Sequence, residues 1–238
     1  MEDTAKALGH PPRHRGGEPG ATSLSPGARS WLAAGGKGSR ARKGFWNSYA
    51  LDRAAIAALA PNPGEDVLVT RVADGSSVFV GKCQITPLVQ ARIEALEREG
   101  LGLTVLLCTG KFEHLRATRP LVEPDRGLQD VLRGVRFDGR LGVLTPSERH
   151  VEQTRARWTA YGFDPVVVSM SPYQGAVTED DEVAKIAQEF RAGGAGFVLC
   201  DCMGFRRSLH DALAAALGVP VVVANLLAAR VVAELVGG

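Results

Sequence analysis

The sequence predicts an α/β protein made of two lobes of parallel sheet flanked by helices. Short apolar runs rich in β-branched residues, typical of buried parallel strands, alternate with longer amphipathic stretches typical of helices. From Arg140 onward this alternation yields four strand–helix units in about a hundred residues, which favours a parallel sheet with helices on both faces. The earlier half has the same character with fewer elements.

Local signals define the elements of the first lobe. Proline and glycine at 61–64 predict a turn before a strand, and apolar residues at helical spacing from Ile85 predict a helix that Gly100 ends. The expected order is helix 52–59, strand 66–72, turn 73–76, helix 85–99, strand 104–108, a weaker apolar run at 120–122 and a short helix at 127–132.

The second lobe has cleaner signals. Pro146 directly after Thr145 is typical of the first turn of a helix, and the run 165–168 is rich in β-branched residues. The expected order is strand 141–144, a helix reaching Tyr161, strand 165–168, a helix from Thr178 to the Gly193–Gly194 pair, strand 196–200, helix 205–216, strand 220–223 and helix 225–236.

Composition divides the chain into three parts. Residues 1–48 hold eight Lys and Arg against three Asp and Glu, a net charge of +5, and lack periodicity. Too little apolar area is available there to offset the ordering entropy, so we expect a disordered or aberrant basic head. Residues 49–138 are expected to form the first lobe and residues 139–238 the second, with the last helix free to pack back on the first lobe.

Bulk properties narrow the class of protein. A content of 45% hydrophobic and 23% charged residues is ordinary for a globular protein, and no apolar run reaches membrane-spanning length. The start of the chain lacks a secretory signal, so the four cysteines are expected to be reduced thiols in the cytoplasm. We expect neither a nucleic acid nor a membrane as partner, because the excess positive charge lies in the head. A homodimer is one assembly that the sequence allows.

Two apolar runs lead to cysteines that open loops, Cys108 and Cys202. Open α/β sheets bind ligands at the carboxyl ends of their strands, so the two thiols are expected to form one site. The Cys200-x-Cys202 pair with His210 raises zinc as an alternative, but a second ligand pair is missing from the sequence, and we expect no metal.

Several motifs make the chain resemble the AroM family, a branch of the aspartate/glutamate racemase superfamily. They are Ala58–Pro61 with Gly64–Asp66 before a strand, the run Leu199–Phe205, and the ending Pro220–Asn225 followed by 226–233. The resemblance covers residues 51–238 and is most specific in the last third. It implies a two-lobed fold with a cleft between the lobes.

The resemblance also implies chemistry. Superfamily enzymes place one cysteine from each lobe against a substrate's α-carbon, and Cys108 and Cys202 match these positions. None needs a metal or an organic cofactor for this chemistry. The chain departs from the racemase pattern, because Thr109-Gly110 follows the first cysteine and Met203-Gly204 follows the second. The family's opening strand before a Gly-x-x-Pro-Arg loop is also not evident before Gly9–Arg13, so the resemblance implies that the first lobe is incomplete.

Racemisation needs a base and an acid on opposite faces of one carbon. We expect both cysteines to lie just before helices. A helix N-terminus would lower the pKa of each thiol toward neutrality. The alternative is that each cysteine is a small buried core residue. The expected partners of a substrate carboxylate are Thr109, Gly110, Thr145, Ser147, Gly204 and Asn225.

Two functions from different classes stay open at this point. The first is a cofactor-independent two-cysteine racemase or isomerase acting on a small amino or hydroxy acid. The second is a non-catalytic protein of the same fold that binds a small carboxylate or has a regulatory role. The thiols at the two strand ends favour the first, and the missing Asn and His beside them favour the second.

Overall fold

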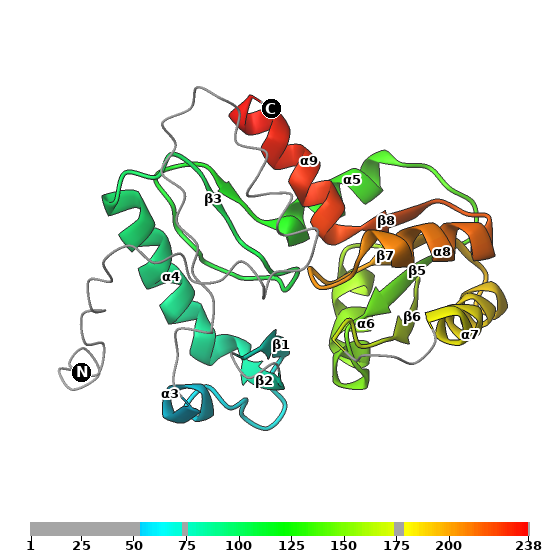
Figure 1. The fold of residues 1–238 in the computed structure, drawn as a ribbon, viewed down its shortest axis with the longest axis horizontal. Helices are drawn as coiled ribbons and strands as arrows, with labels where there is room; N and C mark the ends of the chain where they lie inside the picture. The colour runs from blue at the N-terminus through cyan, green and yellow to red at the C-terminus, as the bar shows by residue number, and fades with distance from the viewer. Residues whose placement is uncertain (1–52, 73–75, 174–178, 238) are drawn as a thin grey trace.

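The computed structural model of the protein describes residues 53–72, 76–173 and 179–237 (Figure 1). The expectations for residues 1–48 and for most of the turn at 73–76 lie outside these ranges. The α/β class with a parallel, helix-flanked sheet is confirmed. Within the described ranges the elements are α3 (Arg53–Ala57), β1 (Val67–Arg71), β2 (Ser77–Gly81), α4 (Lys82–Arg98), β3 (Thr104–Val105), β4 (Leu121–Val122), α5 (Pro124–Gly134), β5 (Arg140–Thr145), η3 (Glu148–His150), α6 (Val151–Ala160), β6 (Pro165–Ser169), α7 (Glu179–Ala192), β7 (Ala195–Cys200), α8 (Arg207–Leu217), β8 (Val221–Val223) and α9 (Ala224–Val236).

A four-stranded parallel sheet in the order β6–β5–β7–β8 forms the centre of the second half. Val143 of β5 pairs with Val167 of β6 and with Leu199 of β7, which fixes the register. The inner strand β5 is buried along nearly its whole length, as expected for a strand with helices on both faces. The carboxyl ends of β5 and β7 therefore lie side by side at Thr145 and Cys200, where open sheets bind ligands.

Helices cover both faces of this sheet. On one face, Phe190 of α7 and Leu213 of α8 pack in one cluster with Cys200 of β7. On the other face, Trp158 of α6 and Leu128 of α5 pack against the sheet, and α9 lies along α5 (Figure 1). Burying each such side chain stabilises the fold by about 1.5–3 kcal/mol, so these contacts hold the helices on the sheet.

The hairpin β1–β2 departs from the predicted parallel arrangement. Val69 of β1 lies opposite Phe79 of β2 in an antiparallel pair, and β2 itself was not predicted. The connection spans only residues 72–76, whereas a parallel crossover needs about a dozen residues or more. A short link therefore forces these two strands to be antiparallel.

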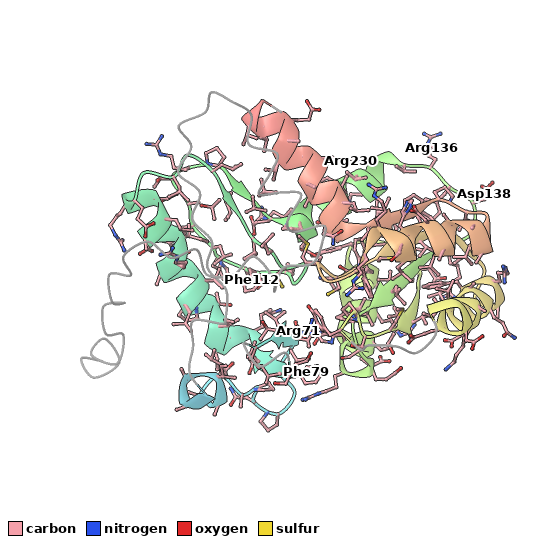
Figure 2. All side chains as sticks on the ribbon, viewed as in Figure 1. Arg71, Phe79, Phe112, Arg136, Asp138 and Arg230 are labelled. Atoms are coloured by element: carbon pink, nitrogen blue, oxygen red, sulfur yellow. The ribbon has the colours of Figure 1, made fainter. Side chains whose placement is uncertain are left out.

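The hairpin docks against the second half of the chain. The Gln153 side chain of α6 accepts a hydrogen bond from the Val67 amide and donates one to the Val67 carbonyl, each at 2.8 Å. The ring centroids of Phe79 and His150 are 5.9 Å apart, and the Arg71 guanidinium lies 6.0 Å from the Tyr173 ring centroid. Figure 2 shows Arg71 and Phe79 on the side of the hairpin nearest to the second half.

The strand that was expected to end at Cys108 is shorter than predicted. β3 and β4 pair in parallel over only two residues each, so β3 ends at Val105. Residues 106–120 contain neither helix nor strand, and Phe112 returns from this loop to pack with Val80 and Ile85 (Figure 2). The apolar anchor at Phe112 holds the loop that carries Cys108 against the hairpin.

Candidate functional site

A cavity of about 290 Å³ lies at the carboxyl edge of the four-stranded sheet. Its walls come from β1, the loop after β3, η3 with α6, and the residues that follow β7, so both halves of the chain contribute. Five predicted site residues line it and three do not. The lining residues are Cys108, Thr109, Gly110, Thr145 and Cys202, and the others are Ser147, Gly204 and Asn225.

The two thiols have the same backbone environment. The Gly110 amide lies 3.3 Å from the Cys108 sulfur, and the Gly204 amide lies 3.4 Å from the Cys202 sulfur. In each case an N–H two residues further along donates to the sulfur. This repeated contact gives each thiol a donor that favours its ionised form.

Both glycines lie in close contact with neighbouring side chains. A Cβ at Gly110 would lie 2.7 Å from the Leu68 side chain, and a Cβ at Gly204 would lie 3.0 Å from both Pro172 and Tyr173. A larger residue at either position would therefore require these side chains to shift.

The expected helix starts after the cysteines are absent from the described structure. Residues 106–120 form no helix, and α8 begins only at Arg207, so helix N-termini do not act directly on the thiols. Burial raises the pKa of the Cys108 thiol, and it raises the pKa of the Cys202 thiol to about 12. The expectation of lowered pKa values is therefore wrong, because desolvation outweighs the backbone N–H donors.

The polar residues predicted to bind a carboxylate fall into two groups. The Thr145 hydroxyl lies in the cavity wall, 3.0 Å from the Thr154 hydroxyl, and the Thr109 hydroxyl donates to the Asp201 carbonyl at 3.2 Å. Asn225 lies behind the wall, where its amide donates to the carbonyls of Met203 at 3.0 Å and Phe205 at 2.6 Å. Asn225 thus holds the loop after Cys202.

His150 was not predicted, and it lines the cavity. The Ser147 hydroxyl lies 2.8 Å from its Nδ1 atom, which orients the ring. Burial lowers the pKa of His150 to about 4, so the imidazole is neutral at neutral pH. The Ser147-x-x-His150 spacing at a helix start was a signal that could have pointed to this residue.

An arginine with two carboxylates was also missed. The Arg157 guanidinium on α6 donates to the Asp201 carboxylate and lies 3.2 Å from the Asp125 carboxylate. Trp158 Nε1 donates to Asp201 at 3.0 Å, and the Tyr161 hydroxyl donates to Asp125 at 2.6 Å. Burial raises the pKa of Asp125, and the charge of Arg157 opposes this shift. Each carboxylate therefore lies beside the Arg157 cation and accepts a hydrogen bond from a neutral donor.

The described residues offer neither a metal-binding cluster nor a membrane-spanning helix. Among the residues that the structure describes, no group of three His, Cys, Asp or Glu side chains is placed to hold a metal ion. Within the same part of the chain, no helix is both long and apolar enough to cross a membrane. All four cysteines are free thiols.

The fold is similar to that of several solved decarboxylases and racemases. Arylmalonate decarboxylase is similar with a TM-score of 0.50 and 16% identity, over 77% of this chain and 89% of that chain. An allantoin racemase from Klebsiella pneumoniae has a TM-score of 0.49 and 20% identity, over 77% of this chain and 80% of that chain. A glutamate racemase from Aquifex pyrophilus has a TM-score of 0.47 and 16% identity, over 65% and 67%.

The sequence identifies the family to which the chain belongs. The AroM protein family matches residues 49–236, and the chain belongs to it, which confirms the resemblance stated above. No protein with a curated description matches the sequence.

Proposed function

We propose that this AroM-family protein is a cofactor-independent racemase or isomerase of a small amino or hydroxy acid, with Cys108 and Cys202 as its two acid–base groups. One observation carries the proposal. The two thiols come from different halves of the chain and line the same small cavity. Each also accepts a backbone N–H from the residue two positions further on.

The proposed reaction transfers protons only. The thiolate of one cysteine removes the α-hydrogen as a proton, so the C–H bond breaks and an S–H bond forms. The electron pair left on carbon is delocalised into the neighbouring carboxylate. The second cysteine then gives its thiol proton to the opposite face of the carbon and becomes the thiolate. The configuration inverts, and the reaction as written consumes no co-reactant.

The cavity offers donors for the substrate carboxylate. Thr145 and Thr154 both line it, and their hydroxyl oxygens share one hydrogen bond at 3.0 Å. Two hydroxyls hold two hydrogens, and the shared bond uses one, so one remains for an acceptor in the cavity. At about 290 Å³ the cavity is at the small end of ligand sites, which favours a substrate of few heavy atoms.

We also place the proposed reaction in the cytoplasm. The chemistry needs both thiols in reduced form, and all four cysteines of the structure are free. A reducing compartment keeps such thiols available, whereas an oxidising one would allow them to form disulfides.

The decisive experiment follows the α-hydrogen. The full-length protein is incubated in D₂O with a panel of small amino and hydroxy acids, and loss of the α-proton signal is measured by NMR. We expect exchange together with loss of optical rotation for at least one compound. Cys83→Ala is the matched control, because Cys83 is exposed and does not line the cavity, and it should leave both rates unchanged.

The alternative is a protein that binds a small carboxylate without catalysis. The raised pKa of both thiols favours it, because a thiol that stays protonated is not a base. Saturable binding of a panel compound with no α-hydrogen exchange, in a folded protein, would establish this alternative and refute the racemase proposal.

A further inference from the structure

Arg157 connects the two halves of the cavity. Its guanidinium donates through one nitrogen to the Thr109 carbonyl, on the loop after β3, and through the other to the Asp201 carboxylate, directly after β7. The first nitrogen also lies 3.2 Å from Asp125 on α5. One side chain on α6 thus contacts three segments that are distant in the sequence.

The contacted residues are neighbours of the two thiols. Thr109 directly follows Cys108, and Asp201 directly precedes Cys202. The Thr109 hydroxyl also donates to the Asp201 carbonyl at 3.2 Å. The segments that carry the two cysteines are therefore joined twice, once directly and once through the arginine.

We infer that Arg157 is a positioning residue that sets the gap between the Cys108 and Cys202 thiols. The inference rests on the proposed function, in which both thiols must reach one carbon from opposite sides. Arg157 acts through the backbone of Thr109 and the carboxylate of Asp201. Misplacing a reacting group by about 1 Å can cost on the order of a hundredfold in rate, so a device that fixes this gap would matter for catalysis.

The geometry explains why an arginine occupies this position. A guanidinium presents several donors in a fixed planar fork, whereas the ammonium of lysine is a point charge on a flexible stem. Trp158 and Tyr161 complete the hydrogen bonding of the Asp201 and Asp125 carboxylates, which fixes the acceptors as well. A lysine at Arg157 would keep the charge and lose the simultaneous contact with both cysteine loops.

Arg157 lines the cavity, so it could instead bind the substrate carboxylate directly. Its two terminal nitrogens already contact Thr109, Asp201 and Asp125. Its Nε is buried and is not exposed to the cavity. These contacts favour a role in positioning over a role in substrate binding.

Arg157→Lys tests the inference in the full chain. Arg140→Lys is the matched control, because Arg140 also joins a carboxylate, Asp164, to the carbonyls of Gly193 and Pro165. Arg140 begins β5, at the opposite edge of the sheet from the cavity. Thermal unfolding is used to confirm that each variant is folded.

Two measurements are made on each folded variant. The first is the rate at which dibromobimane, a reagent that fluoresces once both ends have reacted, bridges Cys108 and Cys202 in a Cys83→Ser background. The second is the ratio of α-hydrogen exchange to racemisation. We expect Arg157→Lys to slow bridging several-fold, leave alkylation by a one-ended reagent unchanged, and raise the ratio about tenfold, since one face can still exchange. Arg140→Lys should change none of these.

The outcomes separate the two proposals. Unchanged bridging and an unchanged ratio in folded Arg157→Lys would overturn the positioning role and leave the racemase proposal standing. Slower bridging in a protein whose wild type never exchanges an α-hydrogen would support the positioning role and refute the racemase proposal. If Arg157→Lys does not fold, Arg157→Gln, whose shorter side chain cannot contact both cysteine loops at once, takes its place in both measurements, and unchanged bridging in that folded variant would overturn the positioning role.

Discussion

Replacing Asp201 by asparagine should destabilise the protein strongly. Asp201 is only 3% exposed, and one of its carboxylate oxygens accepts hydrogen bonds from Arg157 and, at 3.0 Å, from Trp158. Asparagine has nearly the same size, so the substitution creates no cavity. It removes one of the two negative charges beside the Arg157 guanidinium, while its amide oxygen can still accept from both donors.

The expected cost follows from the burial of the ion pair. Removing one partner of a buried pair typically costs about 3–5 kcal/mol, because the other charge is left without compensation. Asp125 still lies 3.2 Å from Arg157 and compensates part of its charge, so we expect a loss of about 3 kcal/mol, near the lower end.

Asp164→Asn provides the matched control. Asp164 pairs with Arg140 at 2.7 Å, but its side chain is 76% exposed, and exposed pairs contribute about 0–1 kcal/mol. Urea unfolding of wild type and both variants at neutral pH measures the two free energies. A loss below about 1 kcal/mol for Asp201→Asn, or equal losses for both variants, would refute the argument that this ion pair is desolvated.

Three further predictions concern the cavity. Labelling of Cys202 in the native protein should be slow at neutral pH and should accelerate as the pH approaches the Cys202 pKa of about 12. The fully buried Cys200 should react more slowly still, and the exposed Cys83 should react fastest. Faster labelling of Cys200 than of Cys202 would contradict the site. Burial lowers the pKa of His150 from 6.5 to about 4, so the neutral form of this residue stabilises the fold fully above pH 6.5. As the pH falls from 6.5 to about 4, up to about 3 kcal/mol of folding stability is lost. Acid unfolding of His150→Gln should lack this loss, and an unchanged pH profile would show that His150 is not buried as described. Cys108→Ala and Cys202→Ala should each abolish racemisation while exchange from one face survives, and a single variant that still racemises at the wild-type rate, measured by polarimetry, would exclude a two-base site.

The second half of the fold could be predicted from sequence because its strands are covered on both faces. Such strands are continuous apolar runs, and the runs at 141–144, 165–168 and 196–200 each lie within an observed strand. The hairpin was harder to predict. Ser77–Gly81 is short, and a local pattern does not tell whether the next strand pairs parallel or antiparallel.

The candidate site divides along similar lines. Cys108 and Cys202 could be singled out because they follow apolar runs, although β3 ends before Cys108 and belongs to a different sheet from β7. Arg157 gave no such signal, because it lies among Glu152, Arg155 and other polar residues of α6, a helix that reads as solvent-exposed. Its burial depends on the loop after β3 and on α5 folding over it, and sequence spacing does not encode those contacts.

The raised pKa values bear on how a two-thiol site would work. A two-base racemase needs one thiolate and one thiol at the same time, and burial alone would keep both protonated. The donors on Gly110 and Gly204 oppose burial, and the charge of Cys108 raises the pKa of Cys202. Once one thiol has ionised, repulsion between the two sulfurs therefore favours keeping the proton on the other. That state contains one base and one acid, so in the proposed mechanism the same burial that limits the amount of thiolate keeps the second thiol ready to donate its proton.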